Sequence, residues 1–220
     1  MITIFFYSYL VLLVICSITG IICTWRLKWT ITPVKLLPWF ILITFISEMI
    51  GLYWNIKYRS NHWVYNIYQV FQFIFYSFTL YQMIKNNRIR KRLLFLSTGI
   101  AVFAIINLCF IQGINHFNTI NFYSGAVILA FFSGYALNEL FRKTDIGNPF
   151  KAPYFWIGGS ILVLSCCLIP LLLPSTFSLA FTRGEVEIIT GMIMLVNFIA
   201  YTMFIISFWF QYKNNATATL

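Results

Sequence analysis

The sequence predicts an all-α integral membrane protein with seven transmembrane helices, its N-terminus outside the cell and its C-terminus in the cytoplasm. Of its 220 residues, 60% are hydrophobic and only 9% are charged, whereas soluble domains carry about 25% charged residues. Apolar runs long enough to cross a bilayer, which takes about 20 residues, recur along the chain. These runs lack the two-residue period of barrel strands, so each must satisfy its own backbone hydrogen bonds as a helix.

Polar, proline-bearing or basic breaks divide the chain into seven predicted spans, which together form a single domain over residues 1–220. Pro38 and Pro153 lie in predicted first turns, where the missing amide costs no helical hydrogen bond. The first run has neither a preceding basic residue nor a cleavage site of small residues, so we expect it to remain as a helix. The predicted spans are residues 3–24, 36–56, 63–84, 93–112, 122–141, 153–174 and 187–210.

The distribution of basic residues predicts the orientation. Twelve of the fifteen Lys and Arg residues lie after the first, third, fifth or seventh span, and only Lys57, Arg59 and Arg183 lie on the other side. Because cytoplasmic loops carry the excess of positive charge, the N-terminus is predicted outside. The formal net charge of +10 then marks loops that lie beside anionic lipid headgroups, and we expect no nucleic-acid partner.

Glu48 is the one charged residue predicted deep in the bilayer, twelve residues into the second span. A charged side chain at the bilayer centre costs roughly 2.5 to 3.5 kcal/mol on insertion scales. No basic residue is expected at the same depth. Glu48 is therefore protonated, hydrogen-bonded to neutral polar groups, or in contact with water or a cationic ligand. A structural role between helices and a binding or proton-coupled role both remain open.

The third span carries a polar stripe at intervals of three and four residues, the spacing of one helix face. The stripe runs from Tyr65 to Tyr76, and two further asparagines fall in the outer halves of the second and fourth spans. We therefore predict a polar pocket that opens outward, with hydrogen-bonded helix packing as the alternative. The predicted ligand-binding residues are Glu48, Asn55, Asn66, Gln69, Gln72 and Asn107.

Features of catalytic and cofactor-binding classes are absent from the sequence. The seventh span has no lysine for a retinal, and His62 and His116 lie in predicted outer loops, where they cannot ligate a buried haem. No H-E-x-x-H, P-loop or G-x-S-x-G motif occurs. The five cysteines lie inside spans without metal-binding spacing, so we interpret them as packing residues. We expect no enzyme activity, no catalytic residues, no cofactor and no metal site.

Two stretches around the second and third spans carry a resemblance to known proteins. They read Glu48-x-x-Gly51-Leu52-Tyr53-Trp54-Asn55 and Asn61-x-Trp63-x-Tyr65-Asn66-x-Tyr68, with a Phe155-Trp156 pair opening the sixth span. In these motifs and over most of its length, the chain resembles a group of small seven-helix membrane proteins common in Bacteroidota, whose activity is not established. That group is expected to have an acidic residue where this chain has Gln72, so the resemblance does not imply a site with paired carboxylates.

A second resemblance is to the PnuC-type vitamin transporters, which are also small seven-helix proteins. Glu48, Gly51 and the Asn61-x-Trp63 pair are similar to their pattern of an acidic residue, a glycine and Asn-x-Trp at the next helix. The chain lacks the fuller Trp-rich motif of those transporters. This resemblance implies a possible analogy with solute transport and no particular substrate.

These features predict a non-enzymatic, multi-pass protein of a bacterial inner membrane that binds a small ligand or a partner in the outward-facing pocket, as a sensor or accessory subunit. One alternative is a transporter for a small polar or cationic solute, with Glu48 as the coordinating or proton-coupled carboxylate. Another is a membrane accessory or effector protein of a defence system. The expected partners are the lipid bilayer, a small-molecule ligand, and a membrane protein or a second copy of the chain.

Overall fold

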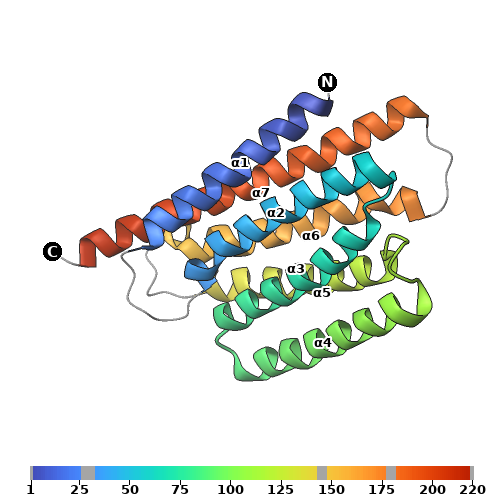
Figure 1. Cartoon of the computed structure of the whole chain (residues 1–220). Helices are drawn as coiled ribbons and strands as arrows, with labels where there is room; N and C mark the ends of the chain where they lie inside the picture. Colours follow the sequence, from blue (N-terminus) through green and yellow to red (C-terminus); the bar gives the residue numbers. More distant parts are fainter. Residues whose placement is uncertain (1, 26–32, 143–147, 177–181, 219–220) are drawn as a thin grey trace.

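A computed structural model describes residues 2–25, 33–142, 148–176 and 182–218, and within these ranges the chain is all-helical (Figure 1). The π-helical turn η1 continues α4, and the short 3₁₀ helix η2 precedes α6. The all-α prediction is thus confirmed for the described residues. The elements are α1 (Ile2–Thr24), α2 (Pro33–Tyr58), α3 (His62–Met83), α4 (Asn87–Ile106), η1 (Asn107–Ile111), α5 (Thr119–Phe141), η2 (Pro149–Lys151), α6 (Pro153–Thr176) and α7 (Arg183–Ala218).

Each of the seven predicted spans coincides with one of the seven long helices. Within the described ranges, six of these helices are long and apolar enough to cross a membrane, and they indicate an integral membrane protein. The exception is α3, whose polar stripe lowers its mean hydropathy. The number of helices that cross the bilayer and their orientation therefore remain predictions.

Four helices begin three or more residues earlier than the sequence predicts, namely α2 at Pro33, α4 at Asn87, α5 at Thr119 and α7 at Arg183. The fourth helix begins at Asn87, six residues early, because the Asn86 side chain accepts hydrogen bonds from the amides of Arg88 and Ile89 and caps the helix. The basic run 88–92 therefore forms the first turns of α4 and is not a loop. Pro38 lies inside α2 and not in its first turn, since α2 already begins at Pro33. Pro153 opens α6 as predicted.

Six helices form a closed ring, and α4 lies outside it. Around the ring α1 packs against α2, α2 against α3, α3 against α5, α5 against α6, α6 against α7, and α7 against α1. Helix α4 packs against α3 and α5 at one edge of the bundle (Figure 1). We call the end of the bundle where α3 meets α4 the basic end, and the end where α2 meets α3 and α4 meets α5 the open end.

The ring is tightly packed toward the basic end. The rings of Phe40 on α2 and Phe75 on α3 stack with centroids 4.2 Å apart. A Cβ atom added to Gly20 on α1 would lie 2.6 Å from atoms of both Pro38 and Phe208, so only glycine permits this approach of α1 to α2 and α7. Close packing of small residues and aromatic rings is the main source of helix association within lipid.

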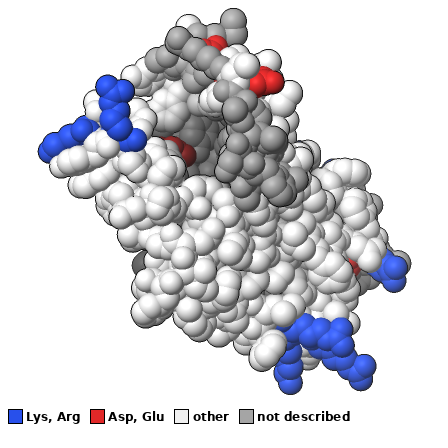
Figure 2. Space-filling model, turned by 90° about the vertical axis from the view of Figure 1, so that its right-hand side faces the viewer, with Lys and Arg blue, Asp and Glu red and all other residues white. Residues whose placement is uncertain are grey.

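Packing is looser toward the open end. Among the side chains that the structure describes, α7 has no buried residue before Ala200 and α6 has none after Ser165. On α1 the first buried residue is Tyr9. Figure 2 views the molecule from the side of the open end and shows Lys and Arg side chains in separate patches at the margin of a wide uncharged surface. The interior of the ring is therefore closed at one end and less filled at the other.

Candidate functional site

Glu48 projects from α2 toward α1 and α3 and is half-buried. Its Oε2 accepts a hydrogen bond of 2.9 Å from the hydroxyl of Tyr65 on α3, and its Oε1 accepts one of 3.2 Å from the hydroxyl of Tyr9 on α1. Gly51, one helical turn after Glu48, leaves space for the Tyr65 ring, because an added Cβ would lie 3.1 Å from its hydroxyl. The Glu48-x-x-Gly51 spacing thus brings a phenol from α3 onto the carboxylate.

Further tyrosines surround the group formed by Glu48, Tyr9 and Tyr65, which we call the Glu48 cluster. Tyr201 on α7 lies beside Tyr9, with the two ring centroids 5.8 Å apart. Tyr68 on α3 shares a hydrogen bond of 2.8 Å with the Thr44 hydroxyl on α2. Within the described ranges Glu48 makes no ion pair. Among the described residues, only the hydroxyls of Tyr9 on α1 and Tyr65 on α3 therefore donate to this carboxylate.

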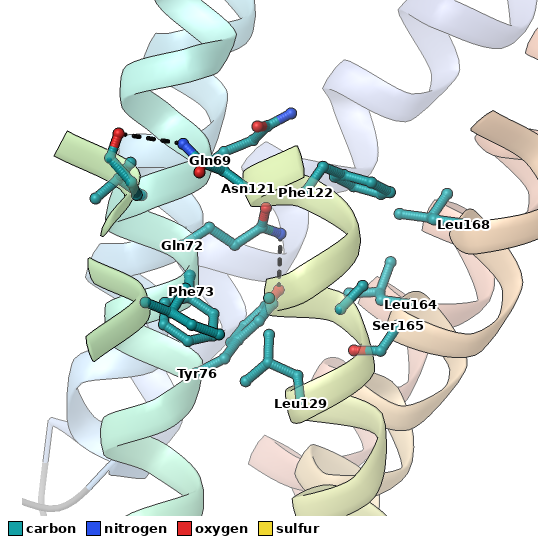
Figure 3. Close-up of a pocket in the computed structure, with 15 residues that line it drawn as sticks. Gln69, Gln72, Phe73, Tyr76, Asn121, Phe122, Leu129, Leu164, Ser165 and Leu168 are labelled. Atoms are coloured by element: carbon teal, nitrogen blue, oxygen red, sulfur yellow. Dashed lines mark hydrogen bonds between the residues drawn. The ribbon is translucent and has the colours of Figure 1, made fainter. Parts of the chain in front are cut away.

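A hollow of about 60 Å³ is lined by residues of α3, α4, α5 and α6, in the half of the bundle toward the open end. Gln69 and Gln72 of α3 and Ser165 of α6 project into it among apolar side chains (Figure 3). Gln72 Nε2 donates to the Tyr76 hydroxyl over 3.5 Å. The Oε1 atom of Gln69 is buried and has no hydrogen-bond partner among the described residues. The hollow therefore presents an unused acceptor within a mostly apolar lining.

Glycine on α5 keeps this hollow open. Gly125 lines it, and an added Cβ would lie 3.0 Å from the Phe73 ring, the nearest side chain of α3. Gly134, nine residues later on the same helix, has open space at the equivalent position. The two glycines are therefore a matched pair for testing the hollow.

The side chain of Asn66 holds the connection between α4 and α5 in place through hydrogen bonds. It is 1% exposed, and its Nδ2 donates to the carbonyl oxygens of Ile114 at 2.8 Å and His116 at 2.7 Å. Its Oδ1 accepts from the backbone amide of Asn118 at 2.9 Å. Both N–H groups of the Asn66 side chain and its carbonyl oxygen therefore bond to the connection between α4 and α5. Asn66 has a structural role in this conformation.

Asn107 lies at the centre of a second amide network at the same connection. It is fully buried at the start of η1, and its Nδ2 donates to the side-chain oxygens of Gln112 at 3.0 Å, Asn121 at 3.1 Å, and Asn118. Asn121 in turn donates to the carbonyl oxygen of Ala104 and lines the hollow. This network joins the ends of α4 and α5 and forms one wall of the hollow.

The six residues predicted to bind a ligand do not converge on one pocket. Gln69 and Gln72 line the hollow, Glu48 lies in its own cluster, and Asn66 and Asn107 hold the connection between α4 and α5. Successive positions of the α3 stripe differ in direction, so Tyr65 points to α2, Asn66 to the connection, and Gln69 toward α5. The remaining residue, Asn55, is exposed on α2. Their role in ligand binding stays a prediction.

Sequence reasoning missed three residues that complete these sites: Tyr9, Asn121 and Ser165. Tyr9 and Ser165 are among the polar residues of apolar spans, and Asn121 precedes the predicted fifth span; a hydroxyl or amide is common enough in membrane helices to carry little signal alone. The one available signal was the spacing of Asn118 and Asn121, three residues apart just before the predicted fifth span. That spacing places both amides on one helix face.

A search for potential metal sites among the described residues finds no group of three or more His, Cys, Asp or Glu side chains. All five cysteines are free thiols. Comparison of the chain with protein-family models, with curated proteins and with solved structures finds no significant match. The function must therefore be argued from the geometry of the hollow and of the Glu48 cluster.

Proposed function

We propose that all seven helices cross the bilayer, with the basic end in the cytoplasm. Helices α2 and α4 are both apolar enough to span and are joined to α3 by short connections at opposite ends of the bundle. The 22 residues of α3 extend about 33 Å, enough for a hydrocarbon core of about 30 Å. Only α3 joins the end of α2, at the open end, to the start of α4, at the basic end. If α2 and α4 both span the bilayer, α3 must span it too, despite its polar residues.

Aromatic residues at both ends support this placement. At the open end the indole of Trp54 lies 4.9 Å from the Tyr58 ring and 5.2 Å from that of Trp63. At the basic end Trp156 stacks near Phe210, with ring centroids 6.4 Å apart. Trp and Tyr concentrate at membrane–water interfaces, where the ring is buried and its polar atom is hydrated. The two clusters therefore fit the two faces of a bilayer.

Within this frame we propose that the protein binds a small, largely apolar molecule carrying a hydrogen-bond donor in the hollow, as a sensor or accessory subunit and not as an enzyme. The observation that carries the proposal is the buried Oε1 atom of Gln69, which has no hydrogen-bond partner among the described residues. A buried acceptor without a hydrogen bond costs about 1–3 kcal/mol. An N–H or O–H group of a ligand would recover this cost. The apolar lining with a few polar groups is typical of small-molecule sites.

Native mass spectrometry of the protein purified from its own membranes tests this proposal. We expect the wild-type protein and Gly134→Leu to retain the same small non-lipid molecule, and Gly125→Leu to lose it because the leucine fills the hollow. Gln69→Leu should also lose the ligand while raising the stability of the ligand-free protein, since the substitution removes the unsatisfied acceptor. Equal retention by Gly125→Leu and Gly134→Leu would place the ligand elsewhere.

A second candidate function is transport of a small solute, and the packing gradient of the ring favours it. A ring closed at the basic end and looser at the open end has the form of a transporter that faces one side of the membrane. In such a protein the packed end must open in a second state. Ser160 is fully buried, and its hydroxyl donates to the carbonyl oxygen of Ala200 at 3.0 Å. A change in the solvent accessibility of this position would therefore reveal such an opening.

The test is maleimide labelling of Ser160→Cys in a background without the native cysteines. If the protein transports, a membrane-impermeant maleimide applied at the basic end should modify this cysteine in membranes. Ser133→Cys, also fully buried, on α5, is the control that reports general loosening of the fold. Protection of both positions over hours would count against transport and leave the ligand-binding proposal in place.

A further inference from the structure

The Glu48 cluster has the features of a binding site for positive charge, and it is separate from the hollow. Neither Glu48 nor either of the two tyrosines that donate to it lines the hollow. Both carboxylate oxygens accept hydrogen bonds from phenols, and a phenol contributes a dipole but no net charge. An ionised carboxylate at this depth is expensive unless a cation accompanies it.

The nearest cation along α2 is engaged elsewhere. The Nζ atom of Lys57, nine residues beyond Glu48 and at the open end, donates to the Tyr53 hydroxyl over 3.4 Å and lies 5.1 Å from the Tyr58 ring centroid. No ion pair joins Glu48 to a basic side chain in the part of the chain that the structure describes. Glu48 is half-buried, so part of its side chain remains accessible. Among the described residues its carboxylate has no cationic partner.

The surroundings of Glu48 fit an organic cation better than a metal ion. Hard metal ions require about six or more oxygen ligands, many of them carboxylates or free carbonyls. Here the neighbouring backbone is helical, so its carbonyl oxygens are used within α1, α2 and α3. One carboxylate and aromatic rings are sufficient for an ammonium group, which binds both to a carboxylate and over the faces of tyrosine rings.

We propose that Glu48, Tyr9 and Tyr65 form a second site that binds the primary ammonium group of a small molecule or of a lipid headgroup. The carboxylate supplies the charge, and the hydrogen bonds from the two phenols hold it between α1 and α3. The ring of Tyr201, 5.8 Å from that of Tyr9, adds a further aromatic side chain. This site does not depend on a ligand in the hollow, so either proposal can fail without the other.

Titration calorimetry with benzylammonium chloride tests the site, using the full chain in the uncharged detergent dodecyl maltoside. We expect saturable binding to the wild-type protein and at least tenfold weaker binding to Glu48→Gln. Glu185→Gln is the matched control, because Glu185 is exposed at the start of α7 and bonds only locally to Thr182. Its affinity for benzylammonium should equal that of the wild type.

Two further measurements keep the proposal open to refutation if Glu48→Gln fails to fold. Benzyl alcohol, which has the same shape but no charge, should not compete with benzylammonium on the wild-type protein. Benzylammonium should also protect Glu48 from dicyclohexylcarbodiimide, as located by peptide mass spectrometry. Equal competition by the alcohol, absence of protection, or full displacement by millimolar sodium chloride would each overturn the ammonium assignment.

The source of the ammonium group is resolved by adding lipid to the same assay. If the headgroup is the natural occupant, short-chain phosphatidylethanolamine should weaken benzylammonium binding and phosphatidylglycerol should not. If neither lipid competes while benzylammonium still requires Glu48, the site takes a soluble amine. Equal competition by both lipids would show binding through the acyl chains and would contradict the proposal.

Discussion

Replacement of Asn66 by leucine should release the connection between α4 and α5 and destabilise the whole bundle. The wild-type amide makes three buried hydrogen bonds to this connection, at 2.8, 2.7 and 2.9 Å. Leucine has a similar volume and cannot replace any of them, nor does it leave room for water. At about 1 kcal/mol for each hydrogen bond, the expected loss is about 3 kcal/mol. For a protein of this size that corresponds to a decrease in Tm of about 6–12 °C.

The matched control is Asn55→Leu, because Asn55 is exposed at the open end of α2 and no described residue bonds to its side chain. Its Tm should stay within about 2 °C of the wild type, as is usual for surface substitutions of up to about 0.5 kcal/mol. Melting is followed by intrinsic fluorescence in detergent, and hydrogen exchange over residues 112–118 reports the local release. Equal Tm values for the two variants, or unchanged hydrogen exchange in Asn66→Leu, would refute the stabilising role of Asn66 at this connection.

Three further predictions follow from the same structure. Alkaline phosphatase fused after Asn118 should be active and the same enzyme fused after Arg90 inactive, and the reverse pattern would invert the proposed orientation. Gly20→Ala should destabilise the protein by about 1–3 kcal/mol through overpacking, whereas Gly134→Ala, with no atom near the new methyl group, should be neutral or stabilising, as judged by melting temperature. Glu139→Gln should weaken the carboxylate's hydrogen bonds to the backbone amides of Lys85 and Asn86, at 2.9 and 3.1 Å; faster hydrogen exchange at residues 85–88 checks this, and unchanged exchange would contradict it.

The number and class of the helices could be read from the sequence because the bilayer imposes one strong rule on every span. Any long apolar run must be a helix, whatever it packs against. Helix ends follow weaker and more local rules, and there the prediction was less accurate. Asn86 caps α4 before the basic run, and α2 starts at Pro33, three residues before its apolar run begins. Both are features of the polar flanks, on which hydropathy gives no information.

The partition of the polar residues into separate sites could not be read from the sequence. Helical spacing groups Asn66, Gln69 and Gln72 on one broad face of α3, but α3 contacts α2 and α5 in the ring and α4 outside it. Small differences in angle therefore direct neighbouring polar side chains to different partners. Which partner each one meets depends on how the helices are arranged, and no local pattern encodes that arrangement. Glu48 could be identified from the sequence because a charged side chain within the bilayer is energetically costly however the helices are packed.

The hydrogen bonds of these residues separate structural from functional polarity. Asn66 is satisfied by three backbone groups, so its role is explained without a ligand. Among the residues that the structure describes, Glu48 is hydrogen-bonded but has no counter-charge, and the buried Oε1 atom of Gln69 has no hydrogen-bond partner. Within lipid, bulk water cannot supply the missing counter-charge or hydrogen bond. Only a bound molecule can supply them. Under the two proposals, a hydrogen-bond donor binds at Gln69, which lines the hollow, and a cation binds at Glu48; these two positions would then connect the fold to a function.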